Sequence, residues 1–347
     1  MISVWGTYLG TSGYAKHTSN LASELAKITE VRMHSNNGLP VNLSQYHSEN
    51  ISDNLVSIAM PPYWDIFSGS RIKNFSGFLV FEADDIPQYW ADILQKEYVK
   101  RVLVPSNHVK KITERHTTKP VYVIPHGYDP KIFYPKPREP DASHLFTFGF
   151  VGGWAQGKND RKGFDILLET FCDTFDNKDN VRLLAKLNMA YQHPQKVMND
   201  LNLLNLPEKE KRPKIDLILD NYTDSQMNDY YNSLDVIAFP TRGEAFNIPG
   251  IESLACKIPN IVTGWGGQMD YINKDNSWIV DYMMKDYSGN DHLYENLKLA
   301  EPKVEDLKRC LKEAYEKRDL VRDKADSIDV SNWTWANSAK KLKEIAE

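Results

Sequence analysis

Short apolar runs alternate with longer helical patterns along most of the chain, and this alternation constrains the fold more than any other feature. The runs are rich in β-branched and aromatic residues and lie at 2–6, 30–34, 55–59, 78–82, 102–105, 121–125, 146–152, 181–186, 215–219, 235–240, 259–263 and 277–281. Strands that alternate with helices form parallel sheets built from βαβ units. The sequence therefore predicts an α/β protein whose sheets are parallel.

The length of the chain and one proline-rich segment predict two domains. At 347 residues the chain exceeds the usual size of a single domain. Residues 134–144 are rich in proline and charge and show no hydrophobic period, which is typical of a linker. We expect two Rossmann-like domains facing each other across a cleft, over residues 1–138 and 139–331, and a terminal helix over 332–347. In such sheets ligands bind at the carboxyl ends of strands, so the loops after strands are the candidate sites.

Charge and cysteine usage narrow the class of protein. The 42 basic and 47 acidic residues argue against a nucleic-acid partner held by bulk charge. Three cysteines lie far apart without metal-ligand or disulfide spacing, which favours a reducing compartment. The N-terminus lacks the basic start of a signal peptide, and no apolar run approaches the ~20 residues of a spanning helix. We therefore expect a cytoplasmic protein.

The loop after the run at 146–152 combines glycines with cations. Gly152 and Gly153 end the run, and Arg161 and Lys162 precede an amphipathic helical pattern. Glycines allow close approach of the backbone, and cations near a helix N-terminus can neutralise phosphate oxygens. A phosphate site and a solvated basic turn explain this segment equally well.

The stretch "GEAFNIPGIE", residues 243–252, places Glu244 before a helix start and Glu252 inside its first turns. Pro249 suits the first turn of a helix, since its missing N–H would be unpaired there anyway. The amides of residues 246–248 are therefore expected to be free to bind an anion. A carboxylate at Glu252 is suited to accept hydrogen bonds from sugar or ribose hydroxyls. The alternative for Glu252 is a favourable interaction with the helix dipole.

Two further glycine loops follow predicted strands. Residues 6–25 contain Gly10 and Gly13 before a helical pattern, without the three correctly spaced glycines of a dinucleotide fingerprint. Residues 264–272, "GWGGQMDYI", either bring backbone amides near an anion or form a tight turn.

These segments together resemble glycosyltransferase family 4, retaining enzymes with the two-domain GT-B fold. The specific match is the Glu-x7-Glu motif of Glu244 and Glu252, supported by "RKGFDILLETF" (161–171), "VIPHGYDPKIF" (123–133), "VPSNHV" (104–109) and the glycine loop at 264–267. The motifs occur in the order that the family has them and cover most of the chain. The resemblance implies that the terminal helix crosses back to the first domain.

The resemblance implies roles on the donor side of the cleft. Glu252 is similar to the glutamate that accepts hydrogen bonds from nucleotide ribose hydroxyls, and Glu244 to the one beside the donor sugar. Lys162 resembles the lysine that neutralises the leaving diphosphate. The other residues expected around the donor are Phe246, Asn247, Ile248, Gly152, Gly153, Gly10 and Gly13.

The first domain is expected to meet the acceptor. Its loop from Gly10 to Gly13 matches the family loop that approaches both donor phosphate and acceptor. Ser12, Tyr14 and His126 are candidates for contact with the sugar or the acceptor. For His126 a structural hydrogen-bonding role is an equal alternative.

The chain departs from the family pattern at several positions. Trp154 follows Gly153 where an arginine is usual, and Arg161 is the candidate to replace that charge. The usual "EGFG" is "EAFN", so Ala245 and Asn247 replace two glycines.

Glu82 marks another departure, because many family members have a histidine near the sugar at the end of the fourth strand. It is a candidate acid–base or orienting group on the acceptor side. The alternative is that Glu82 caps the next helix or pairs with a nearby cation.

The expected function is retaining transfer of a sugar from a nucleotide-diphosphate sugar to a hydroxyl of a glycan, a lipid-linked molecule or another acceptor. Catalytic roles fall to Glu244, Lys162, Arg161 and Glu82. The metal-binding signature Asp-x-Asp is missing from the sequence, so neither a metal nor a further cofactor is expected. The alternatives are a sugar-nucleotide epimerase or hydrolase of the same architecture, and a non-catalytic protein that binds sugar nucleotides.

Residues 96–119 hold seven basic side chains against Glu97 and Glu114. Anionic lipid attracts such a patch, so peripheral membrane contact is one interpretation. A solvated face is the other.

Overall fold

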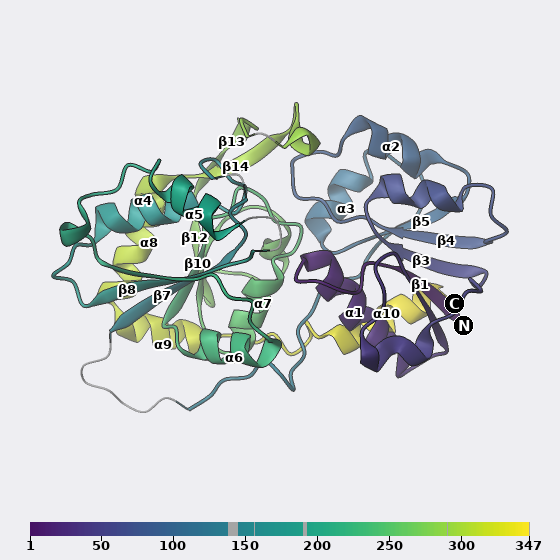
Figure 1. Ribbon diagram of the computed structural model, residues 1–347, viewed down its shortest axis with the longest axis horizontal. Helices are drawn as coiled ribbons and strands as arrows, with labels where there is room; N and C mark the ends of the chain where they lie inside the picture. Colours follow the sequence, from purple (N-terminus) through teal and green to yellow (C-terminus); the bar gives the residue numbers. More distant parts are fainter. Residues whose placement is uncertain (138–144, 156, 190–192, 290, 347) are drawn as a thin grey trace.

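Two six-stranded sheets, each with parallel strands throughout, form the two halves of the computed structural model (Figure 1). The structure describes residues 1–137, 145–155, 157–189, 193–289 and 291–346. The expected domain boundary at 138–139 and residues 138–144 of the expected linker lie outside the described residues. The predicted class, two Rossmann-like α/β domains, is confirmed by this arrangement.

The N-terminal sheet has the strand order β2-β1-β3-β4-β5-β6. Its strands are β1 (Ile2–Gly6), β2 (Val31–Ser35), β3 (Asn54–Ile58), β4 (Asn74–Phe78), β5 (Val99–Val104) and β6 (Val121–Val123). They are connected through α1 (Gly13–Ala26), η1 (Val41–Tyr46), η2 (Pro61–Phe67), α2 (Gln88–Gln95) and α3 (Asn107–Thr113). The middle strands are almost wholly buried, as expected for a parallel sheet covered on both faces.

The C-terminal sheet has the order β12-β11-β10-β7-β8-β9. Its strands are β7 (Phe146–Gly152), β8 (Val181–Leu187), β9 (Lys214–Ile218), β10 (Val236–Phe239), β11 (Asn260–Thr263) and β12 (Ser277–Val280). The helical segments of this half are α4 (Phe164–Thr174), α5 (Pro194–Leu201), η3 (Lys209–Lys211), α6 (Asp224–Asn232), α7 (Ile248–Ala255), η4 (Gly267–Asp270), α8 (Val304–Glu316) and α9 (Arg318–Asp326).

Every predicted apolar run overlaps a strand, but the run at 78–82 does so only at Phe78. The prediction of a strand over 78–82 is wrong, because β4 ends at Phe78 and Glu82 lies in the segment beyond it. Gly77 explains why the sequence did not predict the strand at its true position. A Cβ atom there would stand 2.4 Å from the ring of Trp64, so tertiary packing requires a residue that is unfavourable in strands.

A β-hairpin that the sequence did not indicate lies outside both sheets. Its antiparallel strands, β13 (Tyr282–Asp286) and β14 (Lys298–Pro302), flank η5 (His292–Tyr294). The hairpin stands at the top of Figure 1, between the two domains.

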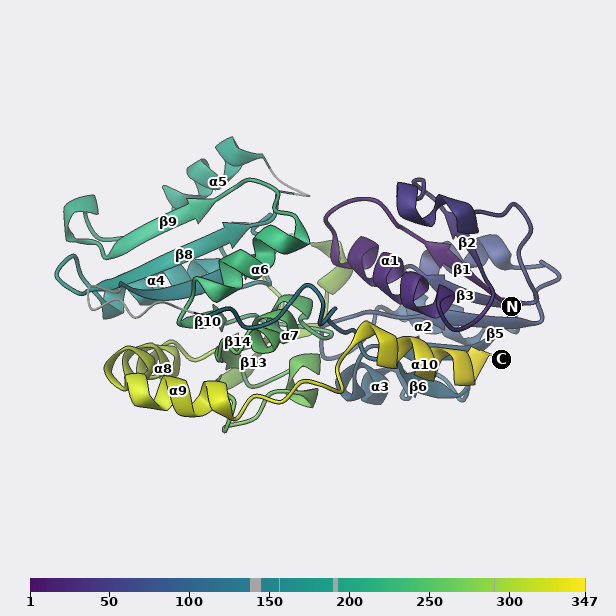
Figure 2. The same cartoon turned by 90° about the horizontal axis from the view of Figure 1, so that it is seen from below.

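The terminal helix α10 (Trp335–Ala346) returns to the N-terminal domain and packs beside α1 (Figure 2). Before it, Tyr128 and Thr334 pair as a parallel bridge. One continuous group of buried apolar side chains joins the N-terminal sheet, α10 and α7 of the other domain. The two domains are therefore joined by core packing as well as by the chain.

Within the described ranges, no helix combines the length and the apolar character needed to cross a membrane. Several basic side chains of residues 96–119 have partners within the chain: Lys96 with Asp65, Lys110 with Glu114, Arg115 with Asp85, and Arg101 with the carbonyl of Ile345.

Candidate active site

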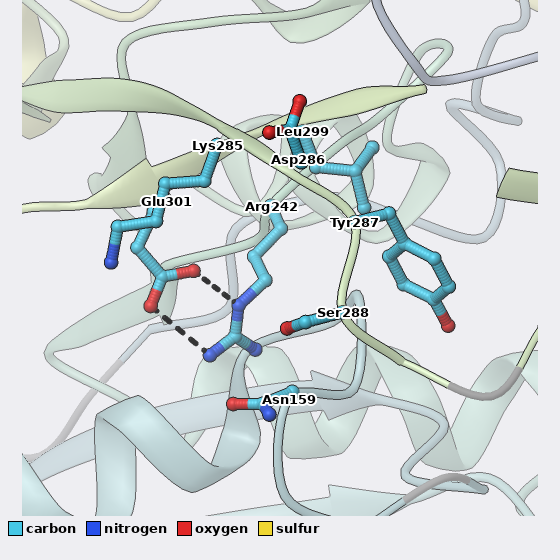
Figure 3. Close-up of a pocket in the computed structure, with 8 residues that line it drawn as sticks. All are labelled: Asn159, Arg242, Lys285, Asp286, Tyr287, Ser288, Leu299 and Glu301. Atoms are coloured by element: carbon cyan, nitrogen blue, oxygen red, sulfur yellow. Dashed lines mark hydrogen bonds and ion pairs between the residues drawn. The ribbon is translucent and has the colours of Figure 1, made fainter. Parts of the chain in front are cut away.

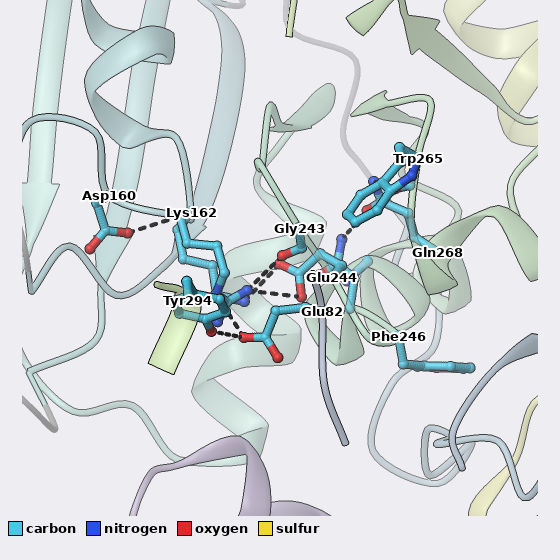
Figure 4. Close-up of polar contacts among 12 residues, drawn as sticks. Glu82, Asp160, Lys162, Gly243, Glu244, Phe246, Trp265, Gln268 and Tyr294 are labelled. Atoms are coloured by element: carbon cyan, nitrogen blue, oxygen red, sulfur yellow. Dashed lines mark hydrogen bonds and ion pairs between the residues drawn. The ribbon is translucent and has the colours of Figure 1, made fainter. Parts of the chain in front are cut away.

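Four side chains predicted to act in catalysis lie together where the segments after β4, β7 and β10 meet (Figure 4). Lys162 Nζ donates to Glu244 Oε1 at 2.7 Å. Arg161 lies between two carboxylates, with Nε 2.7 Å from Glu82 Oε1 and Nη1 3.8 Å from Glu244 Oε2. The cluster joins the two domains, because Glu82 belongs to the N-terminal one.

Gly163 allows the loop after β7 to pack closely against the segment after β10. It precedes α4 with φ +72°, and a Cβ atom there would stand 2.0 Å from the carbonyl oxygen of Pro240. Only glycine combines this backbone conformation with that close approach. The Arg242 N–H then donates to the Arg161 carbonyl at 2.7 Å, so backbone contacts join the two loops of the C-terminal domain.

The carboxylates of the cluster stabilise the charged form of Arg161. Burial by itself would lower the pKa of Arg161, but the carboxylates of Glu82 and Glu244 raise that pKa above its ordinary value. Arg161 Nη1 also donates to the Gly243 carbonyl at 2.6 Å. The guanidinium is therefore a fixed positive charge.

The N-terminus of α7 lies directly after Glu244 in the chain. Asn247 caps this helix with φ +70° and accepts a hydrogen bond from the Gly250 N–H at 3.2 Å. Asparagine tolerates this left-handed conformation, which explains how it replaces a glycine here. The N–H groups of residues 245–248 donate no hydrogen bond to any other described residue. They are donors that an anion can use.

The glycines of residues 264–267 serve close packing. A Cβ atom on Gly267 would stand 1.8 Å from the Ala245 carbonyl oxygen, and the Gly267 N–H donates to the Glu244 carbonyl at 2.7 Å. Gln268 then bonds the Asn247 side chain at 3.0 Å. This loop supports the backbone around Glu244.

Glu252 lies in a second polar group, whose cation comes from the other domain. Its carboxylate forms an ion pair with Lys16 of α1 and accepts a hydrogen bond from Tyr231 Oη at 3.1 Å. Lys16 Nζ also lies 3.1 Å from Asp224 Oδ1. Burial alone would lower the pKa of Lys16, but Glu252 and Asp224 raise it. The sequence did not indicate Lys16.

The predicted donor-site glycines differ in their surroundings. A Cβ atom on Gly10, Gly13 or Gly153 would meet no atom of the described residues within 4 Å, so among these residues space is open beside them. Gly152 has no such space, because a Cβ there would stand 2.9 Å from the Phe150 ring. Phe246 and Ile248 are buried, so only their backbone groups suit a donor contact.

The three residues predicted to contact the sugar or the acceptor have structural partners. Ser12 caps α1 by accepting from the Ala15 N–H at 3.2 Å, and Tyr14 Oη donates to the Val80 carbonyl at 3.3 Å. His126 packs against His17, Phe78, Phe246 and Trp335, with both ring nitrogens buried. Burial lowers the pKa of His126 to about 3.

Arg242 is a positioning residue that sequence reasoning missed. Its guanidinium is buried and bonds both oxygens of Asp165 at 3.1 and 3.2 Å, Glu301 Oε2 at 2.6 Å, and the Asp160 carbonyl. It thereby ties the loop that carries Arg161 to β14. The signal was present in the sequence, since Arg242 is adjacent to the Gly243–Glu244 motif.

A cavity of about 90 Å³ lies beside this arginine, between the hairpin and the loop after β7 (Figure 3). Asn159 and Arg242 line it, together with six residues of the hairpin: Lys285, Asp286, Tyr287, Ser288, Leu299 and Glu301. None of the four predicted catalytic side chains lines it.

Two Rossmann-like domains with a polar cluster between the loops that follow their strands define the GT-B class of fold. Residues 146–287 match the family model described as "Glycosyl transferases group 1". They include Arg161, Lys162, Glu244 and Glu252.

The proteins that are similar to this chain include a viral sequence relative and two bacterial proteins of known structure. A protein named "Putative glycosyltransferase 45", from Sulfolobus islandicus filamentous virus, is 26% identical over 211 residues, 58% of this chain and 52% of that protein. The chain thus spans about half the length of this relative. Sucrose-phosphate synthase from Thermosynechococcus elongatus has a TM-score of 0.72 at 14% identity, covering 99% of this chain and 97% of that one. HepE of Anabaena, solved in complex with UDP-glucose, has a TM-score of 0.72 at 13% identity, with 99% and 98% covered. These likenesses confirm the GT-B fold, and together with the family match they support a transferase enzyme.

Proposed function

We propose that the protein is a retaining, metal-independent glycosyltransferase of the family 4 type, which moves a sugar from a nucleotide-diphosphate sugar to a hydroxyl acceptor. One observation carries the proposal: Arg161 and Lys162 converge on Glu244, next to the N–H groups of residues 245–248, which donate to no other described residue. Two cations and a helix N-terminus are the groups that a leaving diphosphate needs.

In the proposed reaction the hydroxyl oxygen of the acceptor forms a bond to the anomeric carbon of the donor. The bond from that carbon to the diphosphate oxygen breaks, and the diphosphate leaves with the electron pair. Attack on the face that the diphosphate leaves retains the anomeric configuration. It also brings the hydroxyl close enough for a diphosphate oxygen to take its proton. Lys162, Arg161 and the amides of residues 245–248 stabilise the charge that develops.

Glu244 and Glu252 hold different parts of the donor in this proposal. Glu244 accepts hydrogen bonds from hydroxyls of the donor sugar, and Glu252 from those of the ribose. The ribose must therefore replace the Lys16 ion pair at Glu252. A uridine-diphosphate sugar is the first donor to test, because HepE of Anabaena was solved with UDP-glucose.

The test combines a binding screen with a transfer assay. We expect UDP and one or more UDP-sugars to raise the melting temperature, since a ligand that binds only the folded state stabilises it. Sugar should then be consumed only when a hydroxyl acceptor is added. Free sugar formed without acceptor would identify a hydrolase, an altered sugar nucleotide would identify an epimerase, and binding without turnover across acceptors would identify a binding protein.

Stereochemistry and metal dependence are tested in the same assay. An α-linked donor should give an α-linked product in NMR spectra of early product, at a rate that a chelator leaves unchanged. A β-linked product would overturn retention, and loss of activity with the chelator would overturn metal independence.

A further inference from the structure

The hairpin of β13 and β14 is fixed to both domains by backbone hydrogen bonds. On the C-terminal side, the Ala300 N–H donates to the Arg242 carbonyl at 2.8 Å. On the N-terminal side, the Lys298 N–H donates to Asp84 Oδ1 at 2.7 Å, and the Asp84 N–H donates back to the Lys298 carbonyl at 3.1 Å. The hairpin therefore holds the segment after β4 against the C-terminal domain.

Tyr294 extends from this hairpin into the charged cluster. Its side chain is buried, with the ring stacked 5.5 Å from that of Phe81 and tilted against Tyr287 at 5.2 Å. Its hydroxyl donates to Glu82 Oε1 at 2.6 Å (Figure 4). Burial and the neighbouring carboxylate of Glu82 raise the pKa of Tyr294 well above its ordinary value, so the phenol keeps the proton that it donates.

The two oxygens of Glu82 differ as a result. Oε1 accepts from Tyr294 and lies 2.7 Å from Arg161 Nε. No residue in the described part of the chain donates a hydrogen bond to Oε2. A carboxylate held through one oxygen presents its other oxygen in a fixed direction, and that oxygen can accept from a hydroxyl.

Close packing behind Glu82 removes further freedom. A Cβ atom on Gly243 would stand 2.5 Å from the Glu82 carbonyl oxygen and 3.2 Å from Leu299 of β14. The backbone of Glu82 is thus packed on the motif that carries Glu244. Both ends of the Glu82 residue, its backbone and its Oε1, are fixed by the C-terminal domain and its hairpin.

We infer that Tyr294 is a positioning residue for the acceptor side of the site: together with Arg161 it aims Glu82 Oε2 at the attacking hydroxyl of a sugar or polyol acceptor. The inference rests on the proposed function. The hairpin thereby contributes to acceptor recognition, whereas α7 and the loop after β7 hold the nucleotide. Tyr294 acts through Glu82 and does not itself contact the acceptor.

The test is Tyr294→Phe, which keeps the stacked ring and removes only the hydroxyl. We expect kcat/KM for the acceptor to fall about 10- to 100-fold, the scale of a misplaced reactive group, while the dissociation constant of the nucleotide stays unchanged. Tyr282→Phe is the matched control, because Tyr282 lies on β13 of the same hairpin and forms no hydrogen bond with Glu82 among the described residues. In a Glu82→Gln background, Tyr294→Phe should cause little further loss, because the two side chains act as a unit.

Three results would contradict the role of Tyr294 or the proposed function. A Tyr294→Phe enzyme with wild-type kcat/KM for the acceptor overturns the inference and leaves the proposed function intact. A fall in melting temperature with normal transfer at low temperature assigns a purely structural hydroxyl and also overturns it. A wild-type protein that transfers no sugar overturns the proposed function, and the inference with it.

Discussion

At the scale of single residues, Glu244 and Glu252 differ in the cation that each meets. Glu244 pairs with Lys162 of its own domain, and Glu252 pairs with Lys16 of the other. The eight-residue spacing therefore places Glu244 within the charged cluster and Glu252 against Lys16 of α1. The proposal gives these two positions to the donor sugar and the ribose, and mutation separates the two roles.

Glu252→Ala should weaken nucleotide binding by roughly 1–3 kcal/mol, the scale of hydrogen bonds to a charged acceptor. Lys162→Ala should lower kcat more than nucleotide affinity, because its charge matters most as the diphosphate leaves. Calorimetry gives the affinities and steady-state kinetics the turnover. Lys158→Ala, an exposed lysine of the same loop, is the control. Unchanged affinity in Glu252→Ala would contradict the ribose assignment.

At the scale of elements, the loop that carries Arg161 and Lys162 depends on a buried ion pair beneath it. Arg242 and Asp165 are both almost wholly buried, and the Asn159 N–H also donates to Asp165 at 2.7 Å. Without the Asp165 charge, the buried Arg242 guanidinium keeps the partly exposed Glu301 as its ion-pair partner. Arg242 links this loop to β14, so the hairpin and the loop are expected to lose order together.

Asp165→Asn keeps the shape of the side chain and removes its charge. We expect it to lower the free energy of unfolding by about 3 kcal/mol, the lower end of the range for broken buried pairs, because Glu301 still pairs with Arg242. Glu301→Gln changes the more exposed partner of Arg242 and should cost about 1 kcal/mol or less. Denaturant unfolding of both variants measures the difference. Equal losses would show that burial does not govern this pair.

The strands show what sequence patterns can and cannot predict. The buried strands of both sheets are continuous apolar runs such as Phe146–Gly152, and these follow directly from parallel-sheet packing. The hairpin was missed because "YMMKD" and "KLAEP" carry charge and show no alternation. Its strands are stabilised by contacts with both domains, and a local sequence pattern cannot predict such contacts.

The candidate site was predictable to the extent that it lies in loops after strands. The sequence named Glu82, Arg161, Lys162 and Glu244, and the structure brings these four together. Lys16 and Tyr294 were not predicted, because each reaches the site only through tertiary packing. Lys16 lies in the helix after the Gly10–Gly13 loop, and Tyr294 lies in the hairpin that no sequence pattern indicated.

At the scale of the whole molecule, two buried histidines lie in the core that joins the domains. His17 and His126 pack with ring centroids 4.2 Å apart, against Phe78 and Trp335. None of their four ring nitrogens has a hydrogen-bond partner among the described residues. Burial lowers the pKa of both, so both are neutral in the folded protein.

The unfolded chain, with histidine pKa values near 6.5, binds more protons than the folded protein when the pH falls below that value. The free energy of unfolding should therefore be fully retained above about pH 6.5 and should fall toward pH 3. At pH 5 we expect a loss of roughly 2 kcal/mol per histidine. Denaturant unfolding at pH 7.5 and 5 measures this loss, and His17→Leu should reduce it by about 2 kcal/mol, the contribution of one histidine. The exposed His292 provides the control His292→Ala, which should keep the wild-type slope. If the His17→Leu variant lost as much unfolding free energy between pH 7.5 and 5 as the wild type, the lowered pKa of His17 would be contradicted.

The ion pair between Lys16 and Glu252 has a consequence for selectivity. If the ribose binds the carboxylate of Glu252, only molecules in which the Lys16–Glu252 ion pair is broken can bind the donor. The measured dissociation constant then equals the intrinsic one divided by the fraction of such molecules. Every ribonucleotide meets this same factor, whatever its base or sugar. The exchange therefore weakens all such donors equally, and a preference for one of them must arise from contacts elsewhere in the cleft.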